Sequence, residues 1–177
     1  LTVVYVFFKE RLGQDIEYYG IYLLIGVIIY THFAKTTGTT MTVFVGLKNL
    51  TTSVILPKET MILSGTLAFS IEFAISLVIL LALALISGVP MSARWILIPV
   101  VFVMQLLLLN WGSMALAASY VFVRDTDYIY EIFRRLLIFM TPIFYSVESM
   151  DGVARLILLL NPLTYIISFA RQIIIDG

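Results

Sequence analysis

Residues 61–87 constrain the fold of this chain more than any other segment, because they form a long apolar stretch with one charged side chain, Glu72. About 20 consecutive apolar residues are enough for a helix to cross the hydrocarbon core of a bilayer. The whole chain is 61% hydrophobic and 12% charged, whereas a soluble domain is about 45–50% apolar and about 25% charged. We therefore expect an all-α integral membrane protein.

Other apolar segments predict further membrane spans, separated by short polar loops. The run at the N-terminus is too short to cross a bilayer, so we expect it to be the tail of a span and the chain to be a fragment. The predicted segments are the tail of a first span at 1–8, a second span at 18–46, a polar loop at 47–60, a third span at 61–87, a fourth at 94–123, a fifth at 128–147, and two half-helices at 153–175.

Polar side chains within the predicted spans are the candidates for function. Ionisable groups at membrane depth usually mark a pathway or a partner. Lys35 is predicted either to line a pathway and attract an anionic substrate or to extend to the membrane edge. For Glu72 and His32, bonding to neighbouring groups inside the bundle is the simpler interpretation. Together with Tyr30, these residues are the candidates for lining a pathway.

The threonine-rich segment "AKTTGTTMTVFVG", residues 34–46, is unusual in a span. Threonine is tolerated in membrane helices because its hydroxyl can bond its own backbone or a neighbouring helix. We expect this segment to face protein or water rather than lipid.

Several classes of function are not indicated. The net charge is zero, which gives no sign of nucleic-acid binding. The chain has no cysteine and one histidine, so no metal site is predicted. It lacks a glycine-rich phosphate loop ending in Gly-Lys-Ser or Gly-Lys-Thr. We therefore expect a non-enzymatic protein that binds no cofactor itself, with any nucleotide site on another chain or domain.

The stretch "MTPIFYSVESMDGVARLILLLNPLTYII", residues 140–167, is apolar but interrupted by Pro142 and Pro162. Such breaks are tolerated at membrane depth where the backbone is buried in protein or lines a water-filled cavity. Asn161 is suited to cap a helix and Pro162 to occupy its first turn. We expect 153–175 to form a re-entrant hairpin at the outer face; the alternative is one kinked span.

Three stretches resemble one known family. "YVFVRDTDYIYEIFRRLLIFMTPIFY" looks like the Arg-Asp connector, helix and Thr-Pro-Ile-Phe-Tyr end of permease subunits of type-2 ATP-binding-cassette exporters. The greatest resemblance is to permeases that export O-antigen, teichoic acid and capsular polysaccharide. "NPLTYIISFARQIIIDG" and "GVIIYTHFAKTTGTT…KNLTTSVILPKE" resemble further segments of the group, although the family usually has tryptophan near Tyr30.

The resemblance implies a six-span permease of the inner (cytoplasmic) membrane, with the last span absent here. It also implies a homodimer on two ABC ATPase subunits, with ATP and Mg on those partners. Two cytoplasmic loops would contact the ATPase; their predicted residues are Asn49, Leu50, Pro57, Lys58, Glu59, Arg124 and Asp125. The broken segment would form an outer gate; its predicted residues are Thr141, Pro142, Tyr145, Asn161, Pro162 and Tyr165.

The function implied by the resemblance is ATP-driven export of polysaccharide or lipid-linked glycan. Two alternatives remain open. A drug or lipid exporter of the broader type-2 group would have the same fold. A membrane enzyme acting on lipid-linked sugars would need a loop carboxylate pair, and the nearest pair, Asp125 and Asp127, is better explained by its position at a helix start, where the helix dipole favours anions.

Overall fold

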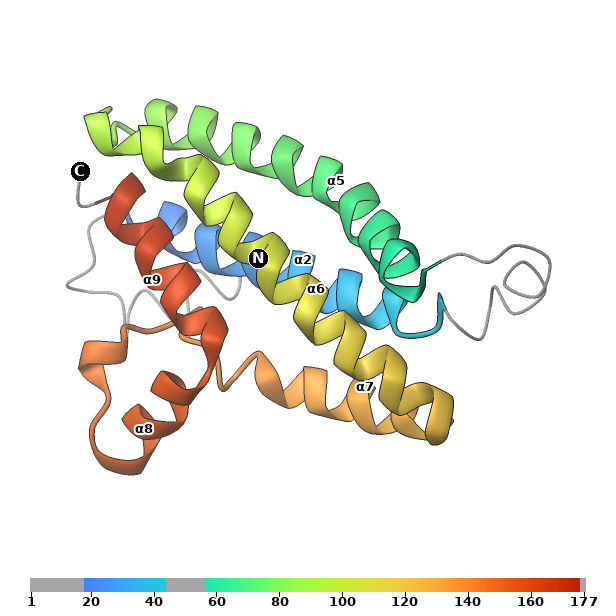
Figure 1. Cartoon of the computed structure of the whole chain (residues 1–177). Helices are drawn as coiled ribbons and strands as arrows, with labels where there is room; N and C mark the ends of the chain where they lie inside the picture. Colours follow the sequence, from blue (N-terminus) through green and yellow to red (C-terminus); the bar gives the residue numbers. More distant parts are fainter. Residues whose placement is uncertain (1–17, 44–56, 176–177) are drawn as a thin grey trace.

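The computed structural model describes residues 18–43 and 57–175, and its three long helices lie side by side (Figure 1). They are α2 (Tyr19–Thr40), α5 (Lys58–Ile86) and α6 (Ile98–Phe122), the last preceded by a short 3₁₀ helix, η1 (Ala93–Leu97). All three are long and apolar enough to cross a membrane. The predicted span tail at 1–8 and most of the predicted loop at 47–60 lie outside the described residues.

A glycine closes α5 and allows α6 to run back beside it. Gly88 follows the helix with a φ of 85°, a left-handed conformation that glycine adopts without strain. The amide of Val89 donates to the carbonyl of Ala84 at 3.0 Å, and the amide of Gly88 donates to Leu85 at 3.1 Å. This pair of bonds satisfies the last carbonyls of a helix that ends at a glycine.

Hydrogen bonds made by polar side chains fix how the long helices are aligned along one another. Hydrophobic burial alone would not determine this alignment. The Gln105 side chain on α6 donates to the backbone carbonyl of Ile29 on α2 at 3.1 Å. The hydroxyl of Thr40 donates to that of Ser113 at 2.7 Å. Gly65 on α5 lies so close to α2 that a Cβ there would be 2.9 Å from the Thr40 methyl group. Small residues and interhelical hydrogen bonds of this kind drive helix association in membranes.

The threonine-rich part of α2 is largely inside the protein. Thr36, Thr37 and Thr40 are buried. The hydroxyls of Thr37 and Thr40 donate to the carbonyls four residues earlier, at 2.6 and 2.7 Å. The prediction that this segment faces protein or water is confirmed for these three residues.

Helix α7 (Thr126–Leu137) is shorter than the span predicted at 128–147. Its 12 residues extend about 18 Å at 1.5 Å per residue, too short to cross a bilayer core of about 30 Å. The chain leaves the helix before Pro142, whose ring would clash with the carbonyl of Ile138 and which cannot donate a helical hydrogen bond. The hydroxyl of Thr141 instead donates to the carbonyl of Leu137 at 2.7 Å.

The C-terminal part contains two helices joined by a sharp bend. After the short 3₁₀ helix η2 (Val147–Ser149) come α8 (Gly152–Leu160) and α9 (Pro162–Ile174), which are bent by 88° relative to each other. Helix α9 packs on α2 and α6 and completes the apolar core. The largest fully buried side chains of this core are Ile25, Ile29, Phe73, Leu80, Ile143, Leu163, Ile167, Ile173 and Ile174.

Candidate functional site

An ion pair joins α2 and α5 on a face that the described residues leave exposed. The ammonium of Lys35 donates to both carboxylate oxygens of Glu72, at 2.8 and 2.6 Å. The two side chains are 48% and 60% exposed, and Glu72 lies at the middle of α5. Charged side chains at this depth face a bundle interior or a water-filled cavity rather than lipid. We therefore expect this face of the helix pair to be directed to protein or water.

The same face of α2 carries a row of polar side chains, which we call the polar stripe: Thr31, Lys35 and Thr39. All three are exposed and stand four residues apart, so they lie above one another on one side of the helix. Gly38, also on this side, leaves room for α7, since a Cβ there would be 3.2 Å from Nη1 of Arg134.

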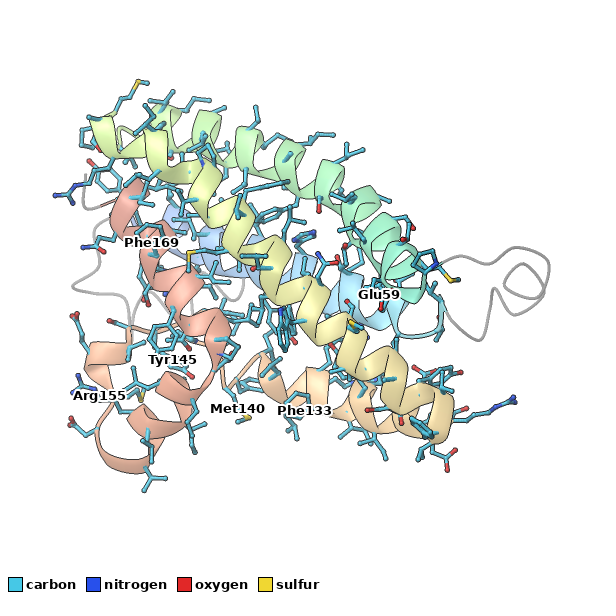
Figure 2. All side chains as sticks on the ribbon, viewed as in Figure 1. Glu59, Phe133, Met140, Tyr145, Arg155 and Phe169 are labelled. Atoms are coloured by element: carbon cyan, nitrogen blue, oxygen red, sulfur yellow. The ribbon has the colours of Figure 1, made fainter. Side chains whose placement is uncertain are left out.

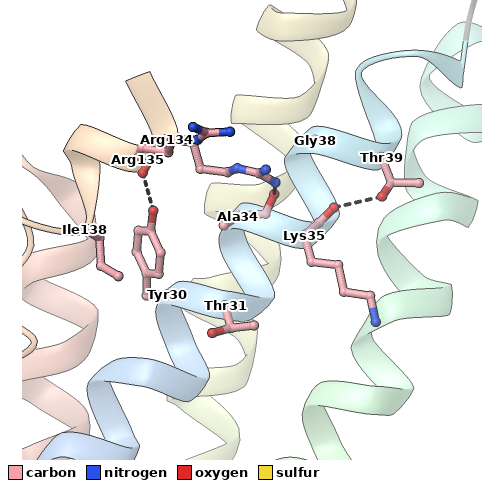
Figure 3. A pocket seen from close by; sticks show the side chains of 9 residues that line it. All are labelled: Tyr30, Thr31, Ala34, Lys35, Gly38, Thr39, Arg134, Arg135 and Ile138. Carbon is pink, nitrogen blue, oxygen red and sulfur yellow. Dashed lines mark hydrogen bonds between the residues drawn. The ribbon is translucent and has the colours of Figure 1, made fainter. Parts of the chain in front are cut away.

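A pocket of about 580 Å³ lies between the polar stripe and α7 (Figure 3). Its charged lining residues are Lys35, Arg134 and Arg135. Arg134 donates to the carbonyl of Ala34 at 3.3 Å, and its own carbonyl accepts a hydrogen bond from the hydroxyl of Tyr30. Lys35 extends toward α5, away from the two arginines. The structure therefore places Tyr30 and Lys35 together at a cationic pocket.

A second pocket, of about 280 Å³, opens on the other side of Lys35, between α2 and α5. We call it the His32 pocket. His32 is 8% exposed and stacks on Phe73, with ring centroids 4.3 Å apart and an interplanar angle of 4°. Lys35 and Glu72 stand in the same lining. All four residues predicted to line a pathway thus lie on or beside the polar stripe.

The bend between α8 and α9 is built by side chains at the start of α9. The side-chain oxygen Oδ1 of Asn161 accepts a hydrogen bond from the amide of Leu163 at 3.0 Å, and Pro162 is the first residue of the helix. The predicted cap and first turn are confirmed. The hydroxyls of Thr164 and Tyr165 donate to carbonyls in the last turn of α8, at 2.6 and 2.8 Å. These carbonyls are therefore hydrogen-bonded although α8 ends at the bend.

Asn161 also connects this bend to the segment after α7. Its amide donates to the carbonyl of Met140 at 3.0 Å and to the hydroxyl of Thr141 at 2.9 Å. The hydroxyl of Tyr22 on α2 donates to the carbonyl of Tyr145 at 2.9 Å. Of the predicted outer-gate residues, Asn161 and Thr141 are thus hydrogen-bonded to each other, and Tyr145 is hydrogen-bonded to α2.

We expect Asn161→Ala to lower the free energy of unfolding by about 1–2 kcal/mol, because it removes a helix cap and two further hydrogen bonds. Asn161→Asp is the matched control, since it retains the capping oxygen but not the amide donor. It should lose less than the alanine variant in detergent-induced unfolding. Equal stability of wild type and Asn161→Ala would contradict this assignment.

Arg171 on α9 is the one buried arginine in the described part of the chain, with 7% exposure. Its guanidinium donates to the carbonyl of Tyr22 at 3.2 and 3.3 Å, of Pro142 at 2.6 Å and of Ile143 at 2.9 Å. It also lies over the Tyr22 ring, 3.3 Å from the centroid. Gly26 permits this packing, because a Cβ there would be 3.1 Å from Nη2.

This central role of Arg171 was not predicted. The signal was present as a charged side chain in an otherwise apolar helical segment, the pattern that marks intramembrane functional or structural groups. Its partner Tyr22, however, is 149 residues away in the sequence. No local pattern connects the two.

Those predicted coupling residues that the structure describes lie at the opposite end of the bundle from the predicted gate. The start of α5 and the connection from α6 to α7 share one end, where Figure 2 labels Glu59; Tyr145 and Arg155 lie toward the other. Asp125 occupies the cap position of α7 without a side-chain cap bond. Asn49 and Leu50 lie outside the described residues, as does the Lys58 side chain.

Within the described ranges, no group of three acidic or histidine side chains is placed so that it could hold a metal ion.

The sequence profile of the family described as "ABC-2 type transporter" matches residues 1–175. The chain belongs to this family. It is similar to the O-antigen export system permease protein RfbA of Klebsiella pneumoniae, with 21% identity over 99% of this chain and 68% of the relative. A protein of the same name from Myxococcus xanthus is 27% identical over 98% of this chain and 67% of the relative. The described residues form helices without strands, three of them long and apolar, which is consistent with a membrane permease of this family.

Proposed function

We propose that this ABC-2 permease forms, as a homodimer, the channel of an ATP-driven exporter that moves polysaccharide or lipid-linked glycan across the cytoplasmic membrane. The observation that carries the proposal is the half-exposed Lys35–Glu72 ion pair, which joins the last third of α2 to the middle of α5, both long apolar helices. Such a pair is stable there if its face borders a hydrated path. The match of 98–99% of this chain to relatives named O-antigen export permeases supports a glycan as cargo.

The fold suggests how ATP hydrolysis on partner subunits would move this path. Helices α5 and α7 both begin at the end of the bundle that carries Pro57 and Asp125. Movement of that end would be transmitted along α7, which is bonded to α2 through Tyr130 and Thr37. At the opposite end, the bonded unit around Asn161 would open or close the exit.

The test is export by the permease reconstituted in vesicles with its ATPase. Polyprenyl-linked glycan should appear on the far side of the membrane only with both ATP and the permease. An ATP-dependent flux of small amphiphiles, with none of glycan, would reject the proposal and favour the second candidate, a drug or lipid exporter of the broader group. Turnover of lipid-linked sugar by the permease alone would instead favour a membrane enzyme.

Asp125 provides a test of the coupling surface. We expect Asp125→Asn to reduce export and the stimulation of ATPase activity by the permease, because it removes a charge at the end of the bundle proposed to contact the ATPase. Asp151→Asn is the matched control, since Asp151 occupies the cap position of α8, at the gate end, also without a side-chain cap bond. Equal coupling in both variants would remove Asp125 from the contact.

A further inference from the structure

Arg134 gives the cationic pocket, the cavity of about 580 Å³ between the polar stripe and α7, an excess of positive charge. The pocket has three cationic side chains. Lys35 is paired with Glu72, and Arg135 is paired with Glu131. The guanidinium of Arg134, in contrast, makes no ion pair within the described part of the chain. The described acidic side chains therefore leave one positive charge of the pocket without a counterion.

The guanidinium of Arg134 is held against α2 and still has donors to offer. Its Nη1 donates to the carbonyl of Ala34 at 3.3 Å and lies so close to α2 that a Cβ on Gly38 would be 3.2 Å away (Figure 3). A guanidinium has five N–H donors, and the described residues accept this one hydrogen bond from it. Arg134 is half-buried, but its Nε and Nη2 atoms are not enclosed by protein. Both nitrogens are therefore accessible to a ligand in the pocket.

The ion pair of Arg135 with Glu131 can give way to a ligand. The two side chains are 76% and 47% exposed, and ion pairs that water reaches so freely contribute little stability. Arg135 lines the same cavity as Arg134, and Thr31 adds an exposed hydroxyl on the α2 wall. Planar guanidinium groups bind two phosphate oxygens at once. The pocket therefore suits a phosphate group.

The position of the cavity indicates that a lipid carries this phosphate. Lys35, on the α2 wall, lies five residues before Thr40, the last residue of α2, which is about 8 Å at 1.5 Å per residue. A bilayer core is about 30 Å thick, so we expect this level to be nearer to the headgroups than to the bilayer centre. Beside the lining residue Ile138 in the chain, Leu136 and Phe139 are 57% and 68% exposed. They offer an apolar surface to a hydrocarbon chain.

We propose that the cationic pocket binds the phosphate group of a lipid, with Arg134 and Arg135 bonded to the phosphate oxygens and the hydrocarbon chain against Leu136 and Phe139. The site depends on the membrane location of the permease and not on its cargo. Two kinds of lipid carry this chemistry. One is a phospholipid of the surrounding membrane, and the other is a polyprenyl phosphate of the kind that carries glycans.

The experiment measures lipid binding to the permease–ATPase complex in detergent by native mass spectrometry. The probes are dioleoyl phosphatidate, undecaprenyl phosphate and, as the lipid without phosphate, dioleoylglycerol. We expect at least one phosphate lipid to bind about tenfold or more tightly than dioleoylglycerol, because hydrogen bonds to charged groups are strong. Binding of phosphatidate identifies a membrane phospholipid, whereas binding of undecaprenyl phosphate alone identifies a glycan carrier. Displacement of the lipid by inorganic phosphate at equal concentration would show a site for the free ion and overturn the proposal.

Two variants test the assignment of residues. Arg134→Gln should lower the affinity for the phosphate lipid by about tenfold or more. Thr31→Glu leaves both arginines in place but adds a competing carboxylate to the α2 wall, and it should weaken binding as well. Arg94→Gln is the control, because Arg94 is exposed and lies outside this pocket. Unchanged binding in Arg134→Gln and Thr31→Glu, an equal loss in Arg94→Gln, or no preference of the wild type for phosphate lipids would overturn the site.

Discussion

Arg171→Gln is expected to lower the free energy of unfolding by about 3 kcal/mol or more, because hydrogen bonds to a charged group contribute about 1.5–3 kcal/mol each and the guanidinium makes several. The carbonyls of Tyr22, Pro142 and Ile143 would lose their shared donor inside the protein. The segment after α7 would then separate from α2. Detergent-induced unfolding of the purified permease measures the loss, with export as a second readout.

Arg171→Lys separates the role of geometry from that of charge. Lysine keeps the positive charge but presents it at one point, whereas arginine reaches several carbonyls with a planar fork. We expect the lysine variant to be nearly as unstable as the glutamine variant. Arg155→Gln is the control, because Arg155 is exposed on α8 and should tolerate the change. Wild-type stability of Arg171→Lys would show that charge alone is required.

Glu72→Lys should have the second largest effect, because it places two ammonium groups side by side where an ion pair now stands. Two unit charges about 4 Å apart interact by about 1 kcal/mol in water and about 4 kcal/mol near a protein surface, and the half-exposed position of this pair puts the expected cost between these values. We expect reduced stability and loss of export.

The reversed pair, Lys35→Glu with Glu72→Lys, should recover most of the stability that the single variant loses. This double-mutant comparison isolates the interaction between the two side chains from the effect of each substitution alone. If the double variant were as unstable as Glu72→Lys, the two residues would not depend on each other. Glu131→Lys is a useful comparison, because Glu131 pairs with Arg135 on the exposed surface of α7 and should lose little.

The long helices could be predicted from the sequence because hydropathy alone determines which segments cross a bilayer. The cap at Asn161 and the first turn at Pro162 were also readable, since both are local features. The end of α7 at Leu137 was not predicted, although Pro142 was recognised as a break. An apolar composition continues through 138–145, and hydropathy does not distinguish helix from a folded apolar segment.

The sequence identified individual residues of the candidate site but not their arrangement in space. Lys35, Glu72 and His32 were each identifiable as polar groups within spans. Their grouping could not be predicted, because it depends on how α2 and α5 rotate about their axes when they pack. The buried bonds of Arg171 depend in the same way on packing between distant segments.

The central claim is that the polar stripe of α2 borders a hydrated export path, and cysteine accessibility tests it most directly. The chain contains no cysteine, so single cysteines can be introduced at Thr31 and Thr39. Trp111 is the control position, because it is exposed among apolar side chains of α6 and we expect it to face lipid. A thiol in water ionises and reacts, whereas one in lipid does not. In the permease–ATPase complex with ATP, a water-soluble maleimide should label Thr31→Cys and Thr39→Cys but not Trp111→Cys. Labelling of Trp111→Cys with none at the stripe would contradict the account.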